Sequence, residues 1–124
     1  MTNSSQPFRF TLWGIGVDSA NVTLFSSPVA ASELLAVETL TICDETSGAT
    51  RAIVYAGRPG AEVAIDQTGT LTAGVPVRLS KTLYLSDGER AKIVFIGTTP
   101  ADVLTVTFSG ERKFALPVEA LAEL

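Results

Sequence analysis

The side chains that most often carry chemistry are scarce in this chain of 124 residues. Histidine is absent, which removes the usual general base and the commonest metal ligand. The one cysteine, Cys43, follows an apolar run and is expected to be a buried, unreactive thiol. The adjacent carboxylates Asp44 and Glu45 stand before a predicted turn and diverge if the strand continues. No catalytic, cofactor-binding or metal-binding residue is therefore predicted, and the chain is not expected to be an enzyme.

The stretch 66–72, DQTGTLT, resembles the phosphorylation loop of P-type ATPases, in which an aspartate accepts the phosphoryl group and a lysine follows it. Here Gln67 stands in place of that lysine. The reaction also requires an α/β domain, an acidic Mg²⁺-binding motif and a second lysine, and none of these is present. A strand that ends in a turn at Thr68 and Gly69 explains the same letters.

Aromatic residues offer a second possible site. Trp13, Tyr55 and Tyr84 are the side chains from which a flat sugar-binding platform on a β-sandwich would be built. Single aromatic residues far apart in sequence are more often core or interface residues. A carbohydrate-binding module is therefore kept as an alternative function.

The elements that must position these residues are predicted to be strands. Apolar and polar residues alternate with a period of two, which is typical of half-buried strands, and shorter apolar runs lie between the alternating ones. Turn residues such as Asp87 and Gly88 separate the runs, and this pair predicts a tight hairpin. About eight short strands indicate an all-β protein, an antiparallel sandwich or a jelly-roll-like fold. The alternating segments are 7–13, 75–80, 91–97 and 102–110, and the shorter runs are 22–25, 35–43, 51–56 and 62–66.

Within 35–43 the alternation changes parity. Leu35 and Val37 share one face, and Leu40 and Ile42 would then point to the other. One extra residue between the two pairs returns all four to the same side. A β-bulge is therefore predicted in this strand.

The chain is expected to form one domain, 1–124, with an arm at each end. Residues 1–7 form the N-terminal arm. In 113–124, a proline is followed by Val118, Leu121 and Leu124 at helical spacing, which predicts a short helix or an ordered arm.

Charge and composition narrow the function classes. The formal net charge is −4, with nine basic and thirteen acidic residues, so no basic patch is expected to bind nucleic acid. No apolar run is long enough for a transmembrane helix. Yet 46% of the residues are hydrophobic and only 18% are charged. In 91–97, apolar residues occupy both faces of the predicted strand, so both faces are expected to be buried. This surplus of apolar side chains predicts a homo-oligomer or a subunit docked on a larger lattice.

The order of three segments is similar to that of small virion structural proteins of tailed bacteriophages. The segments are NVTLFSSP at 21–28, a pair of aliphatic strands across 34–57, and the stretch 79–110. The last contains a turn motif at 84–89 and the closing strand LTVTFSG at 104–110. The chain departs from the pattern at Asp44 and Glu45, where an asparagine turn is commoner. The resemblance covers roughly 22–110 of the chain.

The resemblance implies a β-sandwich built into a virion, and a capsid decoration (cement) protein is the type that we favour. Such a protein is expected to form homotrimers on the capsid surface, over junctions of the major capsid protein, after synthesis in the bacterial cytoplasm. No cofactor, nucleic acid or membrane partner is implied. The terminal segments supply the candidate assembly contacts, which are Phe8, Phe10, Trp13, Phe114, Leu116, Val118, Leu121 and Leu124.

A head–tail connector, tail or baseplate component remains the alternative within this class. It would also be β-rich and oligomeric. Ring symmetry separates the two: three-fold symmetry favours decoration, whereas six- or twelve-fold symmetry favours the neck or tail.

Overall fold

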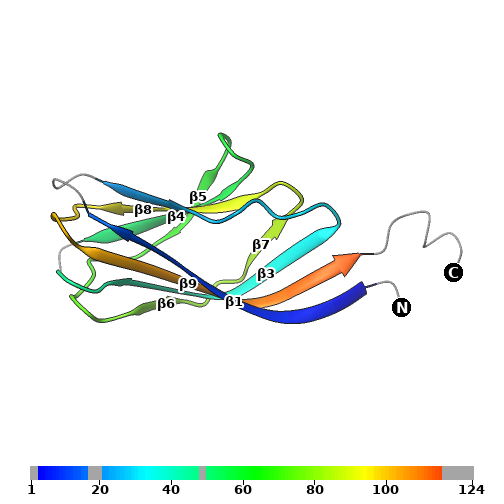
Figure 1. Cartoon of the computed structure of the whole chain (residues 1–124), viewed down its shortest axis with the longest axis horizontal. Coiled ribbons are helices and arrows are strands. Elements are labelled where there is room, and N and C mark those ends of the chain that lie inside the picture. Colours follow the sequence, from blue (N-terminus) through cyan, green and yellow to red (C-terminus); the bar gives the residue numbers. More distant parts are fainter. Residues whose placement is uncertain (1–2, 17–20, 48–49, 116–124) are drawn as a thin grey trace, which may run out of the picture.

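The computed structural model describes residues 3–16, 21–47 and 50–115, and strands are the only regular elements in these ranges (Figure 1). The prediction of an all-β sandwich is confirmed. The strands number nine rather than about eight, and the first, third and ninth, with 13, 12 and 13 residues, are longer than expected. They are β1 Asn3–Ile15, β2 Val22–Phe25, β3 Glu33–Asp44, β4 Arg51–Gly57, β5 Val63–Gln67, β6 Val77–Leu79, β7 Leu83–Ser86, β8 Arg90–Ile96 and β9 Val103–Ala115.

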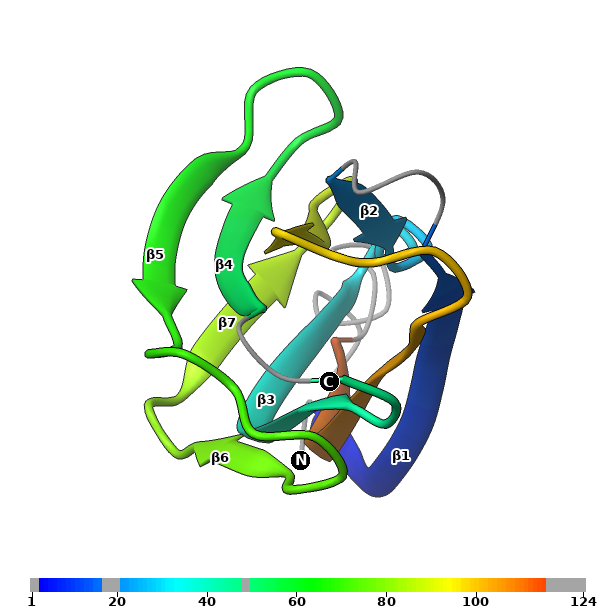
Figure 2. The same ribbon diagram turned by 90° about the vertical axis from the view of Figure 1, so that its left-hand side faces the viewer.

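The topology is that of one long antiparallel hairpin rolled into two layers. The innermost pair of this hairpin, nearest its turn, is β4 with β5. Moving away from the turn, β3 pairs with β6 and β7, then β2 pairs with β8, and finally β1 pairs with β9. Rolling brings β9 beside β3 and β8 beside β4. The result is sheet A, ordered β1-β9-β3-β6 with β7 also on β3, and sheet B, ordered β2-β8-β4-β5 (Figures 1 and 2). This nested pairing is a jelly roll.

The turn at Asp87 and Gly88 forms, but the hairpin predicted there does not. Gly88 has a φ of 77°, and the Glu89 N–H donates to the Ser86 carbonyl at 2.8 Å. The strands on either side of the turn lie in different sheets, β7 on β3 and β8 between β2 and β4. The hairpin prediction was wrong because a local turn signal does not say whether the chain stays in one sheet or crosses to the other.

One apolar core fills the space between the sheets. Alternation in β8 buries Ala91, Ile93 and Phe95, while Val94 and Ile96 on the outer face are half-buried. The largest fully buried apolar side chains come from both sheets, and they are Phe95, Phe108, Ile42, Leu85, Ile93, Leu104, Val37, Val54 and Val106. In strands such as β8, every second residue is buried in this shared interior.

The bulge predicted in 35–43 is confirmed. The register of β3 against β9 shifts between Val37 and Thr39. As a result Leu35, Val37, Leu40 and Ile42 are all buried. The bulge keeps the inward face continuous along a 12-residue strand.

The residues predicted as arms are partly strand. Residues 3–7 begin β1 and pair with 111–115 of β9, so the first part of the C-terminal arm, 113–115, is also strand. Figure 1 shows the start of β1 and the end of β9 side by side at one end of the molecule. The remainder of both predicted arms lies outside the described residues.

Candidate assembly surface

An exposed apolar patch lies on the outer face of sheet A. Trp13 and Ile15 on β1 are 66% and 51% exposed, and Val103 on β9 is 38% exposed. Ile15 pairs directly with Val103, and Trp13 stands one inward-facing residue away from Ile15 on the same face. These three residues, here called the Trp13 patch, form the largest group of exposed apolar side chains on neighbouring strands in the described part of the chain.

Polar side chains border the Trp13 patch on the same face. The hydroxyls of Thr11 on β1 and Thr107 on β9 are hydrogen-bonded at 2.9 Å. Thr105, opposite Trp13, donates to the Glu45 carboxylate at 3.1 Å. An apolar centre with a hydrogen-bonding border is the usual composition of a protein interface.

The strand that carries the patch is an edge of its sheet. β1 pairs with β9 on one side and with no further strand of the described chain on the other. A long unpaired edge offers its backbone N–H and C=O groups to another chain, although Pro7 and the exposed Arg9 reduce this tendency here. The patch and the open edge together make this side of the molecule suitable for contact with a neighbour.

Two of the predicted contact residues point inward instead. Phe10 stacks on Phe108 with ring centres 4.7 Å apart, and Phe8 stacks on Phe10 at 5.7 Å. The Arg112 guanidinium lies 6.0 Å from the centre of the Phe8 ring, and its Nε lies 2.6 Å from a Glu33 carboxylate oxygen. Phe8 and Phe10 therefore support the inner side of β1, while Trp13 stands on the opposite side of the same strand.

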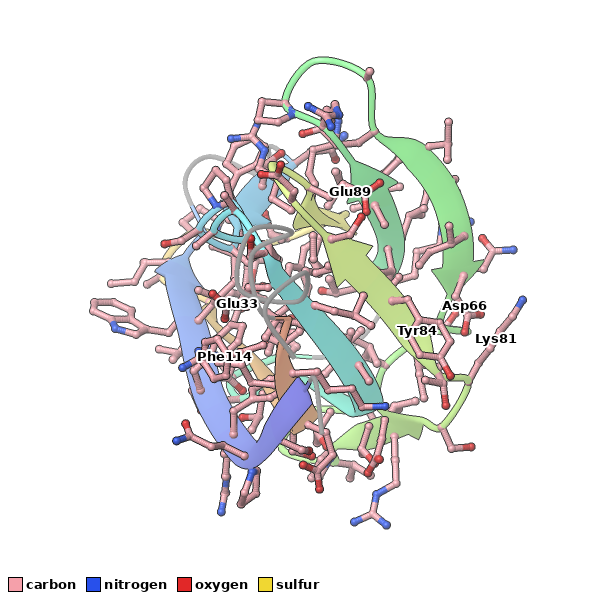
Figure 3. The ribbon with its side chains drawn as sticks, turned by 90° about the vertical axis from the view of Figure 1, so that its right-hand side faces the viewer. Glu33, Asp66, Lys81, Tyr84, Glu89 and Phe114 are labelled. Atoms are coloured by element: carbon pink, nitrogen blue, oxygen red, sulfur yellow. The ribbon has the colours of Figure 1, made fainter. Side chains whose placement is uncertain are left out.

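Of the remaining predicted contact residues, the structure describes one, Phe114. Phe114, 36% exposed, lies near the end of β9 opposite Glu33 of β3 (Figure 3). Leu116, Val118, Leu121 and Leu124 lie outside the described residues. Sequence reasoning missed Ile15 and Val103, although Ile15 shares the parity of Trp13 and would have been found by continuing the alternation by two residues.

The three aromatic residues considered for sugar binding do not form one platform. Trp13 is on β1 and Tyr84 on β7, at opposite edges of sheet A. Tyr55 is on β4 of sheet B, with the Lys92 ammonium 4.5 Å from its ring centre. A sugar ring cannot stack on all three at once.

Two buried aspartates at one end of the sandwich are held by loop donors. Asp44 accepts hydrogen bonds from the N–H groups of Thr46 and Ser47, at 3.1 and 3.0 Å, and from the Thr50 hydroxyl at 2.7 Å. Asp102 accepts from the Ser47 hydroxyl at 2.7 Å. Because Ser47 contacts both carboxylates, they tie the loop after β3 to the loop before β9.

Thr99 completes the shell of Asp102. Its N–H and hydroxyl donate to the carboxylate at 2.7 and 2.8 Å. Burial alone raises the pKa of Asp102, but the hydrogen bonds from Thr99 and Ser47 outweigh burial and hold this pKa below its usual value. Asp44 and Asp102 thus act as structural acceptors. Among the described residues, no three Cys, Asp or Glu side chains gather closely enough to hold a metal ion.

Cys43 is predicted to be unreactive in the folded protein. Burial raises the pKa of its thiol to about 11, and the neighbouring carboxylates Glu45 and Asp44 add to the rise. At pH 8 the thiolate is therefore much rarer in the folded chain than in the unfolded chain, and we expect modification by a disulfide reagent to be at least ~100-fold slower without denaturant. The absorbance of the thiol that the reagent releases on reaction measures the modification rate with and without denaturant. Equal rates with and without urea would contradict this placement of Cys43.

The fold defines the chain as a jelly-roll β-sandwich. No protein-family model matches the sequence, and no curated protein matches it. None of the described residues belongs to a helix long and apolar enough to cross a membrane.

Two solved structures are similar to the chain at a low level. One is a chain in the structure of infectious bursal disease virus, Gt strain, with a TM-score of 0.41 and 13% identity over 90% of this chain and 32% of that one. The other is from the Gx strain, with a TM-score of 0.32 and 10% identity over 99% of this chain and 45% of that one. The chain spans less than half the length of either, and similarity at this level carries no inference about function.

Proposed function

We propose that the chain is a non-enzymatic virion structural protein, a capsid decoration (cement) protein that assembles as a homotrimer on the capsid surface. The observation that carries this proposal is the Trp13 patch on an open edge strand. An apolar patch beside unpaired backbone is surface that a neighbouring subunit would cover. The likeness of 22–110 to small tailed-phage virion proteins supports the kind of assembly.

A trimer requires an interface that closes on itself. In a three-fold ring each copy offers one surface and receives a different one. The Trp13 patch and the β1 edge are the offered surface in this proposal. Phe114 and the residues beyond β9, among them Leu116, Val118, Leu121 and Leu124, are proposed to contact the major capsid protein. Because β1 starts and β9 ends at the same end of the molecule (Figure 1), the start of β1 and the end of β9 can contact the same neighbour.

Replacing Trp13 is expected to dissociate the trimer. The wild-type protein should sediment at three times the mass of the 13.0 kDa chain. Trp13→Ser removes the largest exposed aromatic side chain of the patch, and central aromatic residues dominate interface energies, so the dissociation constant should rise at least ~30-fold. Sedimentation equilibrium at several micromolar concentrations measures the change.

Tyr84→Ser is the matched control, because Tyr84 is also aromatic, is 62% exposed, and lies at the other edge of sheet A. It should leave the trimer intact. A wild-type protein that is monomeric at these concentrations, or equal dissociation in both variants, would remove the basis of the proposal. Six- or twelve-fold assembly would favour the head–tail connector instead.

Particles assembled without the chain test the decoration role directly. Such particles should keep their tails but lose resistance to heat and to low salt. Intact heads that have lost their tails would assign the chain to the neck or tail.

A further inference from the structure

A cavity opens between the two sheets on the side of the sandwich away from β1. It has a volume of about 320 Å³ and lies between β5, the edge of sheet B, and β6 and β7, the edge of sheet A. It reaches the core, because Leu40 and Val54 in its wall are only 5% and 1% exposed. Its walls are aliphatic, and they are formed by Leu40, Val54, Ile65, Leu79 and Leu83.

The opening arises from a break in the edge of sheet A. β6 pairs with β3 through Val77–Leu79, and β7 pairs with β3 through Leu83–Ser86. Between the two strands, 80–82 leave the sheet. The edge that faces β5 is therefore discontinuous, and the side chains of Lys81 and Thr82 line the cavity at this break.

Polar groups are confined to this mouth. Asp66 pairs with the buried Val54 and shares its inward direction. Its carboxylate accepts a hydrogen bond from the N–H of Gln67 at 2.8 Å. Within the described part of the chain, the side chains of Lys81 and Thr82 make no hydrogen bond or ion pair. Figure 3 shows Asp66, Lys81 and Tyr84 at the same side of the molecule.

Protection of the edge strand β5 from pairing with another chain explains the position of Asp66 but not the cavity itself. An inward-pointing charge such as Asp66 deters pairing with another chain. It does not account for a hollow that reaches Val54, since protein interiors are close-packed and an empty hollow lowers stability. A molecule that fills the hollow restores the missing contacts and finds hydrogen-bonding groups at the mouth.

We propose that this cavity binds a small amphipathic molecule with an aliphatic body and an uncharged head group that both donates and accepts hydrogen bonds, such as an alcohol or a primary amide. The head donates to the Asp66 carboxylate and accepts from Lys81 or Thr82. A cavity of about 150 Å³ takes up benzene, so this cavity suits a ligand of roughly ten to fourteen non-hydrogen atoms. The proposal is independent of the assembly role.

Titration with 1-decanol, followed by methyl NMR, tests the proposal. The methyl signals of Leu40, Val54 and Leu83 should shift and saturate. Those of Leu12 and Leu35, which line a separate groove of about 490 Å³ beside Phe10, should not. At ten times the dissociation constant, the unfolding temperature should rise by about 4 °C, because the ligand binds only the folded state.

Two variants locate the site. Leu83→Trp places a larger side chain in the cavity and should abolish saturable shifts. Asp66→Ala, at the half-buried mouth, removes the acceptor for the head group and should weaken binding at least tenfold while leaving the fold intact. Trp13→Ser is the control and should bind 1-decanol as the wild type does, whatever its oligomeric state.

Three results would overturn the proposal. The first is the absence of saturable shifts up to the solubility limit of 1-decanol. The second is equal shifts at Leu12 and Leu35, which would show unspecific partitioning. The third is cavity methyl signals that change with protein concentration in the absence of 1-decanol, since this would show that a neighbouring copy fills the cavity.

Discussion

Gly110→Ala is expected to lower the free energy of unfolding by about 3 kcal/mol, because β9 has no room for a side chain where it passes the bulge of β3. Gly110 pairs with Val37 on one side and Phe8 on the other. A Cβ at Gly110 would overlap the Ala36 carbonyl oxygen and lie 2.8 Å from the Glu38 nitrogen. Both are backbone atoms of the bulge, so they cannot move away without breaking the strand pairing.

Urea denaturation measures this loss of stability, when the wild type and the variants are fitted with the same dependence of the unfolding free energy on urea concentration. Gly69→Ala is the control, since a Cβ there meets no heavy atom within 4 Å, and its φ lies outside the left-handed region. It should change the free energy of unfolding by less than about 0.5 kcal/mol. If the two variants unfold at the same urea concentration, the register of β9 against the bulge is wrong.

Asp102→Ala is expected to destabilise the protein by about 3 kcal/mol at pH 7, because it leaves the Thr99 N–H and the hydroxyls of Thr99 and Ser47 without their charged acceptor. All three donors lie within 2.8 Å of the carboxylate. The substitution also removes the hydrogen bond between Ser47 and Asp102, which is one of the contacts that join the loop after β3 to the loop before β9. Thermal and urea unfolding at pH 7 measure the change.

The stability that Asp102 contributes to the folded protein is expected to decrease at acidic pH. The pKa of Asp102 is lower in the folded state than its usual value, so its contribution to stability is fully present above the unfolded pKa of about 3.9. It is lost as the pH falls through the folded pKa. The difference between wild type and Asp102→Ala should therefore be constant from pH 7 to pH 5 and shrink below pH 4.

Asp87→Ala is the control for this experiment. Asp87 is an exposed turn residue, and its carboxylate makes no hydrogen bond or ion pair within the described residues. Its substitution should change stability little at any of these pH values. A difference for Asp102→Ala that persists undiminished at pH 2 would show that packing, and not the charge, is what Asp102 contributes.

The strands were predictable because their signal is local. Alternation with a period of two depends only on which face of a strand is buried. For that reason even the parity change between Val37 and Leu40 could be interpreted as a bulge, which the register of β3 confirms. The same alternation puts Phe8 and Phe10 on the face opposite Trp13, yet all three were predicted to be assembly contacts. Of the three, Trp13 is the exposed one, whereas Phe8 and Phe10 pack against the core.

The pairing of the strands and the candidate sites depend on contacts that are distant in sequence. The local sequence of the turn at Asp87 and Gly88 does not reveal whether the two strands that flank it pair with each other or belong to different sheets. The Trp13 patch needs Val103 from the other end of the chain. The cavity needs a wall from each sheet, since Val54 belongs to β4 of sheet B and Leu83 to β7 of sheet A.

The nested pairing of the jelly roll also sets the order in which the chain can reach its native state. Among the described strands, only β4 and β5 both follow each other in sequence and pair with each other. Thr11 and Thr107, by contrast, whose hydroxyls are hydrogen-bonded, lie 96 positions apart in the sequence. A high contact order makes folding slow, since long loops must close before the outer pairs gain any stabilisation. We therefore expect the pairing of β1 with β9 to form late, and the apolar surface around Phe10 and Phe108 to be exposed to aggregation until it does.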